Sequence, residues 1–109
     1  MSQSAFSTVN LPADLLANLD SLGYTSMTPI QSQSLPLILD GRDVIGQAMT
    51  GSGKTAAFGL GLLARLDASK FRVQSLVLCP TRELADQVTK EIRRLARGIN
   101  NIKVLTLCG

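Results

Sequence analysis

The sequence has no histidine and only two cysteines, and both shortages limit the chemistry that its side chains can support. Cys79 and Cys108 each lie inside a short apolar run, and the chain contains no Cys-x-x-Cys pair. Zinc sites in small domains are built from clusters of cysteine and histidine at such spacings. The sequence therefore argues against a zinc site and favours two reduced, buried thiols that pack as small hydrophobic groups.

Long hydrophobic runs and early positive charges are also missing. The longest stretch without a polar side chain covers the nine residues 56–64, whereas a membrane-spanning helix needs about 20 apolar residues. No lysine or arginine precedes Arg42, although a secretory signal starts with positive charge. We therefore expect a cytoplasmic protein without a transmembrane segment.

The charges that are present are unevenly divided. Residues 1–41 hold three acidic residues and no basic residue, a net charge of −3. Residues 42–109 hold all eleven basic residues and five acidic residues, a net charge of +6. The basic part is compatible with polyanion binding, but solvating surface lysines and arginines also produce such an excess.

The hydrophobic pattern divides the chain into an N-terminal extension, 1–41, and the first part of a larger domain, 42–109. In the extension we expect a helix over 12–22, capped by Asn10 and ended by Gly23. A second helix is expected to begin at Thr28-Pro29 and to stop at residues 40–41. After residue 42, short buried strands over 43–48, 74–79 and 102–107 alternate with helices over 54–66 and 81–97. This alternation predicts the α/β class, with a parallel sheet and flanking helices.

A glycine-rich loop between the first predicted strand and the next helix carries the strongest chemical signal. Gly51 and Gly53 allow a tight turn whose backbone N–H groups point inward, and the following helix adds the positive end of its dipole. Lys54 can reach the β- and γ-phosphates of a nucleotide, and the Thr55 hydroxyl can ligate Mg²⁺. The pattern predicts a P-loop, although Ala48 replaces the first glycine of the general motif. The alternative is a glycine-rich turn that binds nothing.

Three segments together resemble the DEAD-box family of ATP-dependent RNA helicases. Residues 23–31 resemble its Q motif, and Phe6 stands seventeen residues before Gly23, where the family places an isolated aromatic. Residues 48–55 resemble its motif I, and residues 80–85 resemble its motif Ia. Gly109 stands where its Gly-Gly motif begins. Met27 departs from the proline common in the family. In its detailed sequence, the chain is most similar to the bacterial DbpA group.

The resemblance implies a RecA-like P-loop NTPase fold, the cofactors ATP and Mg²⁺, and the role of each matching residue. It implies catalytic roles for Lys54 and Thr55, with Thr55 also a metal ligand. Gln31 would hydrogen-bond adenine, and Phe6 would stack on it. The implied nucleotide-binding residues are Phe6, Tyr24, Gln31, Ala48, Met49, Thr50, Gly51, Ser52, Gly53, Lys54 and Thr55. The implied RNA-binding residues are Pro80, Thr81, Arg82, Glu83 and Gly109. The RNA would be ribosomal in the full-length protein, in ribosome assembly.

Each of these residues also has a purely structural interpretation. Thr28 and Gln31 have the spacing of a capping box, in which the glutamine only satisfies the helix N-terminus. Phe6 could pack on the core, and Arg82 with Glu83 could be an ordinary helix start. The helix dipole explains the basic cluster of Arg93, Arg94 and Arg97 without any ligand, so we leave the cluster out of the site, and an RNA backbone footprint is the alternative.

The sequence contains no Asp-Glu-Ala-Asp or Ser-Ala-Thr motif, and a second RecA-like domain with an arginine finger is missing. Phosphoryl transfer in such enzymes depends on those parts. We therefore expect the isolated chain to lack ATPase and unwinding activity, and its unpaired sheet edges to promote self-association. A nucleotide- or RNA-binding fragment without turnover is the second hypothesis, and a small-molecule kinase with a P-loop is the third.

Overall fold

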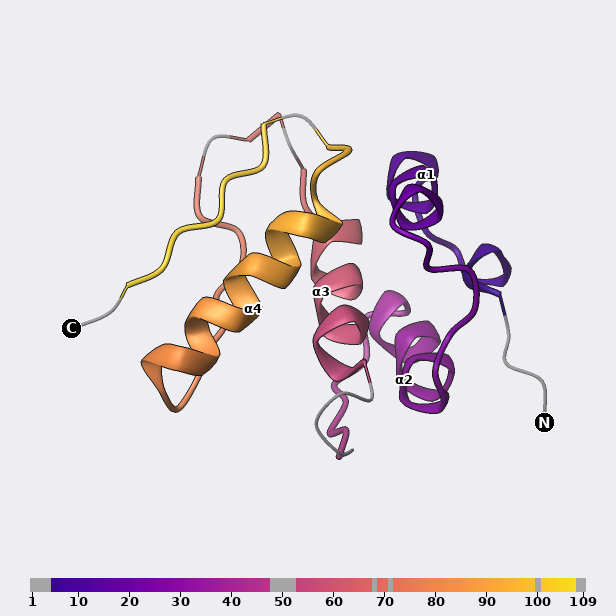
Figure 1. The fold of residues 1–109 in the computed structure, drawn as a ribbon, viewed down its shortest axis with the longest axis horizontal. Helices are drawn as coiled ribbons and strands as arrows, with labels where there is room; N and C mark the ends of the chain where they lie inside the picture. Colours follow the sequence, from indigo (N-terminus) through magenta and orange to yellow (C-terminus); the bar gives the residue numbers. More distant parts are fainter. Residues whose placement is uncertain (1–4, 48–52, 68, 71, 100, 108–109) are drawn as a thin grey trace.

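The computed structural model describes residues 5–47, 53–67, 69–70, 72–99 and 101–107. The described residues form the short 3-10 helix η1 (Phe6–Thr8) and the helices α1 (Ala13–Ser21), α2 (Pro29–Leu39), α3 (Lys54–Ala64) and α4 (Arg82–Leu95). Helix α3 lies between α2 and α4 (Figure 1), and α1 packs against α4 near its C-terminal end. Among the described residues, no helix has the length and apolar character needed to cross a bilayer.

Helix α3 is the centre of the packing because its sequence is almost entirely small or apolar. Ala56, Ala57, Leu60 and Leu63 are all buried. Small residues allow the neighbouring helices to approach closely: a side chain at Gly61 would overlap Ile38 of α2, and one at Gly59 would lie 3.2 Å from Leu95 of α4. The core extends from here to Phe6, Leu15 and Leu35 in the N-terminal part. The boundary that we drew after residue 41 remains a prediction, and the core runs across it.

Both helices of the N-terminal part end as their glycines predict. Gly23 has φ +84° and Gly41 has φ +83°. After α1, Gly23 N donates to Asp20 O at 3.0 Å and Tyr24 N donates to Leu19 O at 2.8 Å. This is the Schellman pattern, which fixes the direction in which the chain leaves the helix. It sets the starting position of Tyr24.

The predicted N-cap of α1 is wrong by two residues. Pro12, not Asn10, precedes the first helical residue, and no side chain caps the backbone there. The Asp14 carboxylate instead accepts from Leu15 N at 2.9 Å, so it satisfies one of the free N–H groups from within the first turn. The start of α2 agrees with the prediction, because Thr28 precedes the helix and Pro29 is its first residue.

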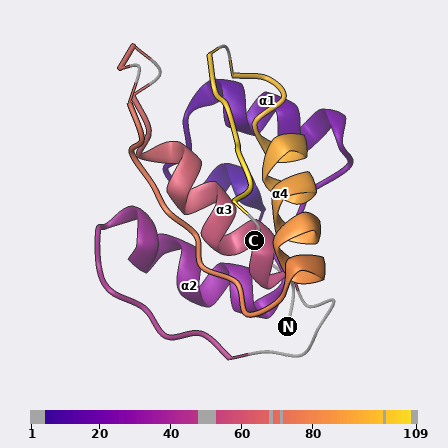
Figure 2. The ribbon, with the colours of Figure 1, turned by 90° about the vertical axis from the view of Figure 1, so that its left-hand side faces the viewer.

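The three segments predicted as strands contain no hydrogen-bonded strand within their described residues. The isolated bridge that the described part of the chain does contain joins Ala5 and Ser26, outside these segments. Segments 72–80 and 101–107 run across the face of the helical layer (Figure 2). Side chains alternate along them: Val77 and Ile102 pack against the core, whereas Leu78 is 84% exposed and Leu105 is 81% exposed. The side-chain alternation typical of a β-strand is therefore present, but the backbone hydrogen bonds between strands are not. A parallel strand is stable only when neighbouring strands satisfy its backbone groups, and these segments do not pair with one another.

Candidate nucleotide-binding site

A cavity of about 550 Å³ lies where the N-terminal segment, the start of α3 and one face of α4 meet. This volume is within the range of small-ligand sites in proteins. The cavity is lined by Phe6, Tyr24, Ser26, Thr28, Gln31, Gly53, Lys54, Thr55, Ala56, Leu84, Gln87 and Glu91. All the predicted nucleotide-binding residues that the structure describes are in this set. Ala48, Met49, Thr50, Gly51 and Ser52 lie outside the described residues.

Gln31 joins the two motifs that the sequence left separate. Its amide oxygen accepts from Thr28 N at 2.9 Å, and its amide nitrogen donates to Gly53 O at 3.1 Å. The first bond is the glutamine half of the capping box, so the structural interpretation is correct. The second bond places Gln31, which is 6% exposed, directly against the end of the P-loop. In this arrangement each end of the amide makes one hydrogen bond, so an adenine contact through the amide nitrogen would use its second N–H or replace the bond to Gly53.

The end of the P-loop is shaped by Gly53. Its φ of +92° lies in the left-handed region, and a side chain there would overlap the Gln31 amide nitrogen. Helix α3 begins at the next residue, so Lys54 and Thr55 occupy its first turn, where free N–H groups and the helix dipole favour an anion. Lys54 is exposed and Thr55 is half-buried at the cavity wall. A hydroxyl in this position fits the oxygen-rich coordination that Mg²⁺ prefers.

Thr28 contributes a polar atom that the capping box does not use. Its hydroxyl oxygen is buried and has no hydrogen-bond partner among the described residues. It would lie 3.1 Å from a side chain built on Gly53. A buried hydroxyl without a partner at a cavity wall is available to a ligand or to an ordered water.

The position of Phe6 is fixed by backbone contacts. Phe6 N donates to Thr25 O at 3.3 Å, next to the bridge between Ala5 and Ser26. The side chain is 3% exposed and belongs to the core, so the prediction that it packs on the core is correct. It also lines the cavity, so the packing interpretation and a stacking role are compatible at this position.

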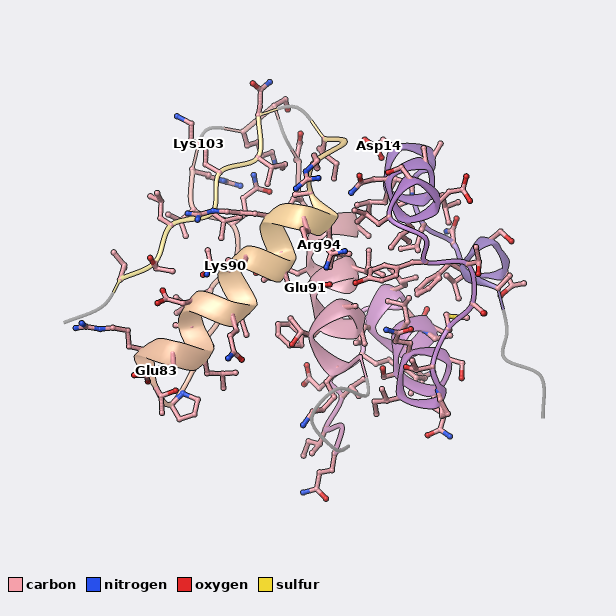
Figure 3. The ribbon with its side chains drawn as sticks, viewed as in Figure 1. Asp14, Glu83, Lys90, Glu91, Arg94 and Lys103 are labelled. Atoms are coloured by element: carbon pink, nitrogen blue, oxygen red, sulfur yellow. The ribbon has the colours of Figure 1, made fainter. Side chains whose placement is uncertain are left out.

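Helix α4 supplies a wall that the sequence reasoning missed. Leu84, Gln87 and Glu91 are spaced by three and four residues, so they share one face of the helix and reach the cavity together. Helical periodicity could have grouped these residues, but it could not show that their face is turned toward Tyr24. Figure 3 shows Glu91 and Arg94 on the side of α4 that faces the N-terminal part, with Glu83 at the far end of the helix.

The four predicted RNA-binding residues of motif Ia do not line the cavity and lie at the start of α4. Pro80, Thr81, Arg82 and Glu83 are all exposed. The Thr81 hydroxyl accepts from Leu84 N at 3.1 Å, so this residue caps the helix. Gly109 lies outside the described residues. The structure thus places the predicted nucleotide-binding residues around the cavity and the predicted RNA-binding residues at the exposed start of α4.

The cavity has the chemistry of a nucleotide site. Its lining combines two aromatic side chains and an amide with a lysine, a hydroxyl and a helix N-terminus. Aromatic rings can stack on a base, and the cationic helix start can hold a polyphosphate. No single element supplies both sets of groups, so the cavity depends on the packing of the N-terminal segment against α3 and α4.

Comparisons with known proteins agree with this chemistry. The family profile for DEAD/DEAH box helicases matches residues 28–109. The ATP-dependent RNA helicase DbpA of Escherichia coli strain K12 is 66% identical over 107 residues, which cover 97% of this chain and 23% of that protein. The chain therefore spans less than a quarter of the length of this relative.

Solved helicase structures share its fold. The RNA helicase Prp28 of Chaetomium thermophilum bound to ADP aligns with a TM-score of 0.82 at 39% identity, over 100% of this chain and 27% of that one. Dbp5 of S. cerevisiae bound to RNA and ADP BeF3 aligns with a TM-score of 0.82 at 32% identity, over 89% of this chain and 25% of that one. These likenesses confirm the predicted fold class. Together with the profile match over most of the sequence, they show that this chain belongs to the DEAD/DEAH-box helicase family of enzymes.

Proposed function

We propose that the protein binds ATP and Mg²⁺ in the cavity between the N-terminal segment, α3 and α4. The observation that carries this proposal is the convergence of Phe6, Tyr24 and Gln31 with Lys54 and Thr55 around one cavity, although they come from distant parts of the sequence. Lys54 would bind the β- and γ-phosphates, and the Thr55 hydroxyl would ligate Mg²⁺. Gln31 would recognise the adenine edge after exchanging its bond to Gly53 O.

We further propose that the protein as a whole uses ATP to open short RNA duplexes. The chain spans about a quarter of the relatives and solved structures that it matches, so hydrolysis and unwinding are proposed for the whole protein. The exposed residues 80–83 would contact the RNA sugar-phosphate backbone without reading its sequence. We also propose ribosomal RNA as the substrate and ribosome assembly as the setting, as the resemblance of the sequence to the DbpA group implies.

Calorimetric titration of the chain with ADP and with ATP, both with Mg²⁺, tests the nucleotide proposal. Lys54→Ala should weaken both affinities about tenfold or more, because a charge-assisted bond to phosphate is lost. Lys103→Ala removes an equal charge from an exposed position away from the cavity, and it should leave the affinities unchanged. GDP should bind more weakly than ADP, because guanine does not match the amide of Gln31. Equal affinities of the wild-type chain and Lys54→Ala would contradict the proposal.

A further inference from the structure

Three side chains from two distant segments form a closed network at the rim of the nucleotide cavity. Tyr24 Oη donates to Glu91 Oε1 at 3.1 Å. Arg94 Nη1 donates to Glu91 Oε2 at 3.2 Å and approaches Tyr24 Oη at 3.4 Å. The Arg94 guanidinium carbon is 5.6 Å from the centre of the Tyr24 ring, which is within cation–π range. We call these three residues the tyrosine clamp.

Both ends of the tyrosine clamp are attached to fixed backbone. The Schellman turn at Gly23 sets the position of Tyr24. Glu91 and Arg94 are three residues apart on α4, and the adjoining face of the helix is buried through Val88, Ile92 and Leu95. The C-terminal end of α4 is held in addition by Asn18, whose amide donates to Arg94 O at 2.8 Å and to Leu95 O at 2.9 Å.

The two charged residues of the tyrosine clamp differ in their distance from the cavity lining. Glu91 lines the cavity and Arg94 does not. The Glu91 side chain is 22% exposed and that of Arg94 is 42% exposed, so solvent screens their ion pair only partly. Without Arg94, an unpaired carboxylate would stand at the wall of a cavity built for a polyanion. Arg94 balances the charge of the Glu91 carboxylate, which also accepts a hydrogen bond from the Tyr24 hydroxyl.

We propose that Glu91 and Arg94 are positioning residues for the nucleotide. They hold the Tyr24 ring as the side wall of the base pocket, and Arg94 cancels the repulsion that the Glu91 carboxylate would exert on the phosphates. The proposal rests on the proposed nucleotide function, and it assigns a role to α4 residues beyond those of the Q motif and the P-loop. Neither residue touches the reacting atoms.

Substitutions of Arg94 and Glu91 should weaken ADP binding to different degrees. Arg94→Met keeps an unbranched apolar stem and removes the charged guanidinium, so it should weaken ADP binding about tenfold by freeing the carboxylate. Glu91→Gln keeps an acceptor for the tyrosine hydroxyl and should weaken binding about threefold or less. The double substitution should therefore bind ADP more tightly than Arg94→Met alone. A side chain that only stabilises the fold would not be rescued in this way.

Matched controls are available on α4 and directly after its C-terminal end. Arg97→Met and Asp86→Asn make the same changes of charge at exposed positions outside the clamp. Tyr24→Phe removes only the hydroxyl, keeps the ring, and should weaken ADP binding about threefold. Circular dichroism of each variant shows whether the helices are retained, and Tyr24→Phe keeps the test valid if Arg94→Met unfolds the chain.

The experiment is calorimetric titration of the chain and its variants with ADP and Mg²⁺, together with intrinsic fluorescence. Tyr24 is the single tyrosine and the sequence has no tryptophan, so the tyrosine emission reports on this residue alone. A tyrosine hydroxyl that donates to a carboxylate loses emission, so Glu91→Gln should increase the signal and Asp86→Asn should not. This optical readout tests the geometry without any nucleotide.

The outcomes separate the two proposals. Binding of ADP that depends on Lys54, with clamp variants equal to their controls, would overturn the clamp and leave the nucleotide site intact. Absence of ADP binding that depends on Lys54 would overturn both. Failure of Glu91→Gln to relieve the loss in Arg94→Met would overturn the electrostatic role of Arg94.

Discussion

At the residue scale, the site is organised by contacts between side chains and backbone rather than by the motif residues alone. Gln31 bonds to Thr28 N in its own helix turn and to Gly53 O at the end of the P-loop. One amide therefore connects two motifs that are 22 positions apart in the sequence. Because glutamine has both a donor and an acceptor, it satisfies two backbone groups of opposite character, and a carboxylate cannot do the same.

Gln31→Glu separates the two bonds. The carboxylate can still accept from Thr28 N, but it has no proton to donate to Gly53 O. We expect a loss of about 1–3 kcal/mol in the free energy of unfolding, since a partly buried carbonyl loses its donor and meets a like partial charge. Urea unfolding measures the loss. Gln33→Glu makes the same change at an exposed position of α2 and should have little effect. Equal stabilities of the two variants would show that the contact with Gly53 contributes nothing.

Gly53→Ala tests the close approach of the P-loop to Gln31. The substitution should cost about 1–2 kcal/mol for the left-handed backbone alone, and more because the new methyl group would overlap the Gln31 amide. Gly23→Ala is the matched control: its φ of +84° is similar, but no atom lies within 4 Å of the added carbon. The difference between the two unfolding free energies isolates the clash. If Gly23→Ala were the more destabilising change, the approach of Gln31 would be unimportant.

At the scale of elements, α4 serves two surfaces at once. Its first turn carries the exposed residues proposed for RNA, and its middle turns line the nucleotide cavity through Leu84, Gln87 and Glu91. The basic residues near its end have specific partners as well as a favourable position on the dipole. Arg93 donates to Val104 O at 2.6 Å, and Arg94 bonds to Glu91. The dipole interpretation of this cluster was therefore incomplete.

Thr81→Ala should weaken α4 from its N-terminal end. The Thr81 hydroxyl accepts from Leu84 N at 3.1 Å, and loss of such a cap costs about 1 kcal/mol. Thr81→Ser keeps the oxygen and should restore the thermal unfolding midpoint, whereas both variants would weaken RNA binding if the methyl group contacts RNA. A midpoint unchanged in Thr81→Ala would contradict the capping role. Comparison of stability and RNA affinity in the two variants separates the structural role from the proposed RNA role.

At the scale of the whole molecule, one side of the extended segments is packed and the other is bare. Ile45, Leu78 and Leu107 are 95%, 84% and 93% exposed, respectively. Val77, Cys79, Ile102 and Val104 lie on the helical layer instead. Exposed apolar rows next to unpaired backbone groups favour association with other chains.

We expect the chain to self-associate through this bare side, and Leu78→Lys should reduce the association. A lysine there places charge in the apolar row while the helical core is untouched. Leu37→Lys is the control, because Leu37 is 42% exposed on α2 and lies outside the extended segments. Light scattering over a range of concentrations measures the mass of each variant. A wild-type chain that stays monomeric at all concentrations would contradict this expectation.

The sequence by itself determined the helices, their glycine ends, the P-loop and the family. These features depend on local patterns: apolar spacing, caps such as Thr28 and left-handed glycines such as Gly23 are encoded within a few residues. Through the resemblance, the sequence also predicted that Gln31 and Lys54 belong to one site, and both line the same cavity.

Only the tertiary structure decided which distant groups meet. The bond from Gln31 to Gly53, the wall formed by Glu91 and the contact of Arg94 with Tyr24 depend on how α4 packs against the N-terminal part. The predicted strands show the same distinction. The alternation of their side chains is encoded locally, whereas the backbone hydrogen bonds of a sheet require neighbouring strands from other parts of the chain. A pattern of residues specifies the shape of one segment, but the free energy of a contact between two segments depends on their relative placement.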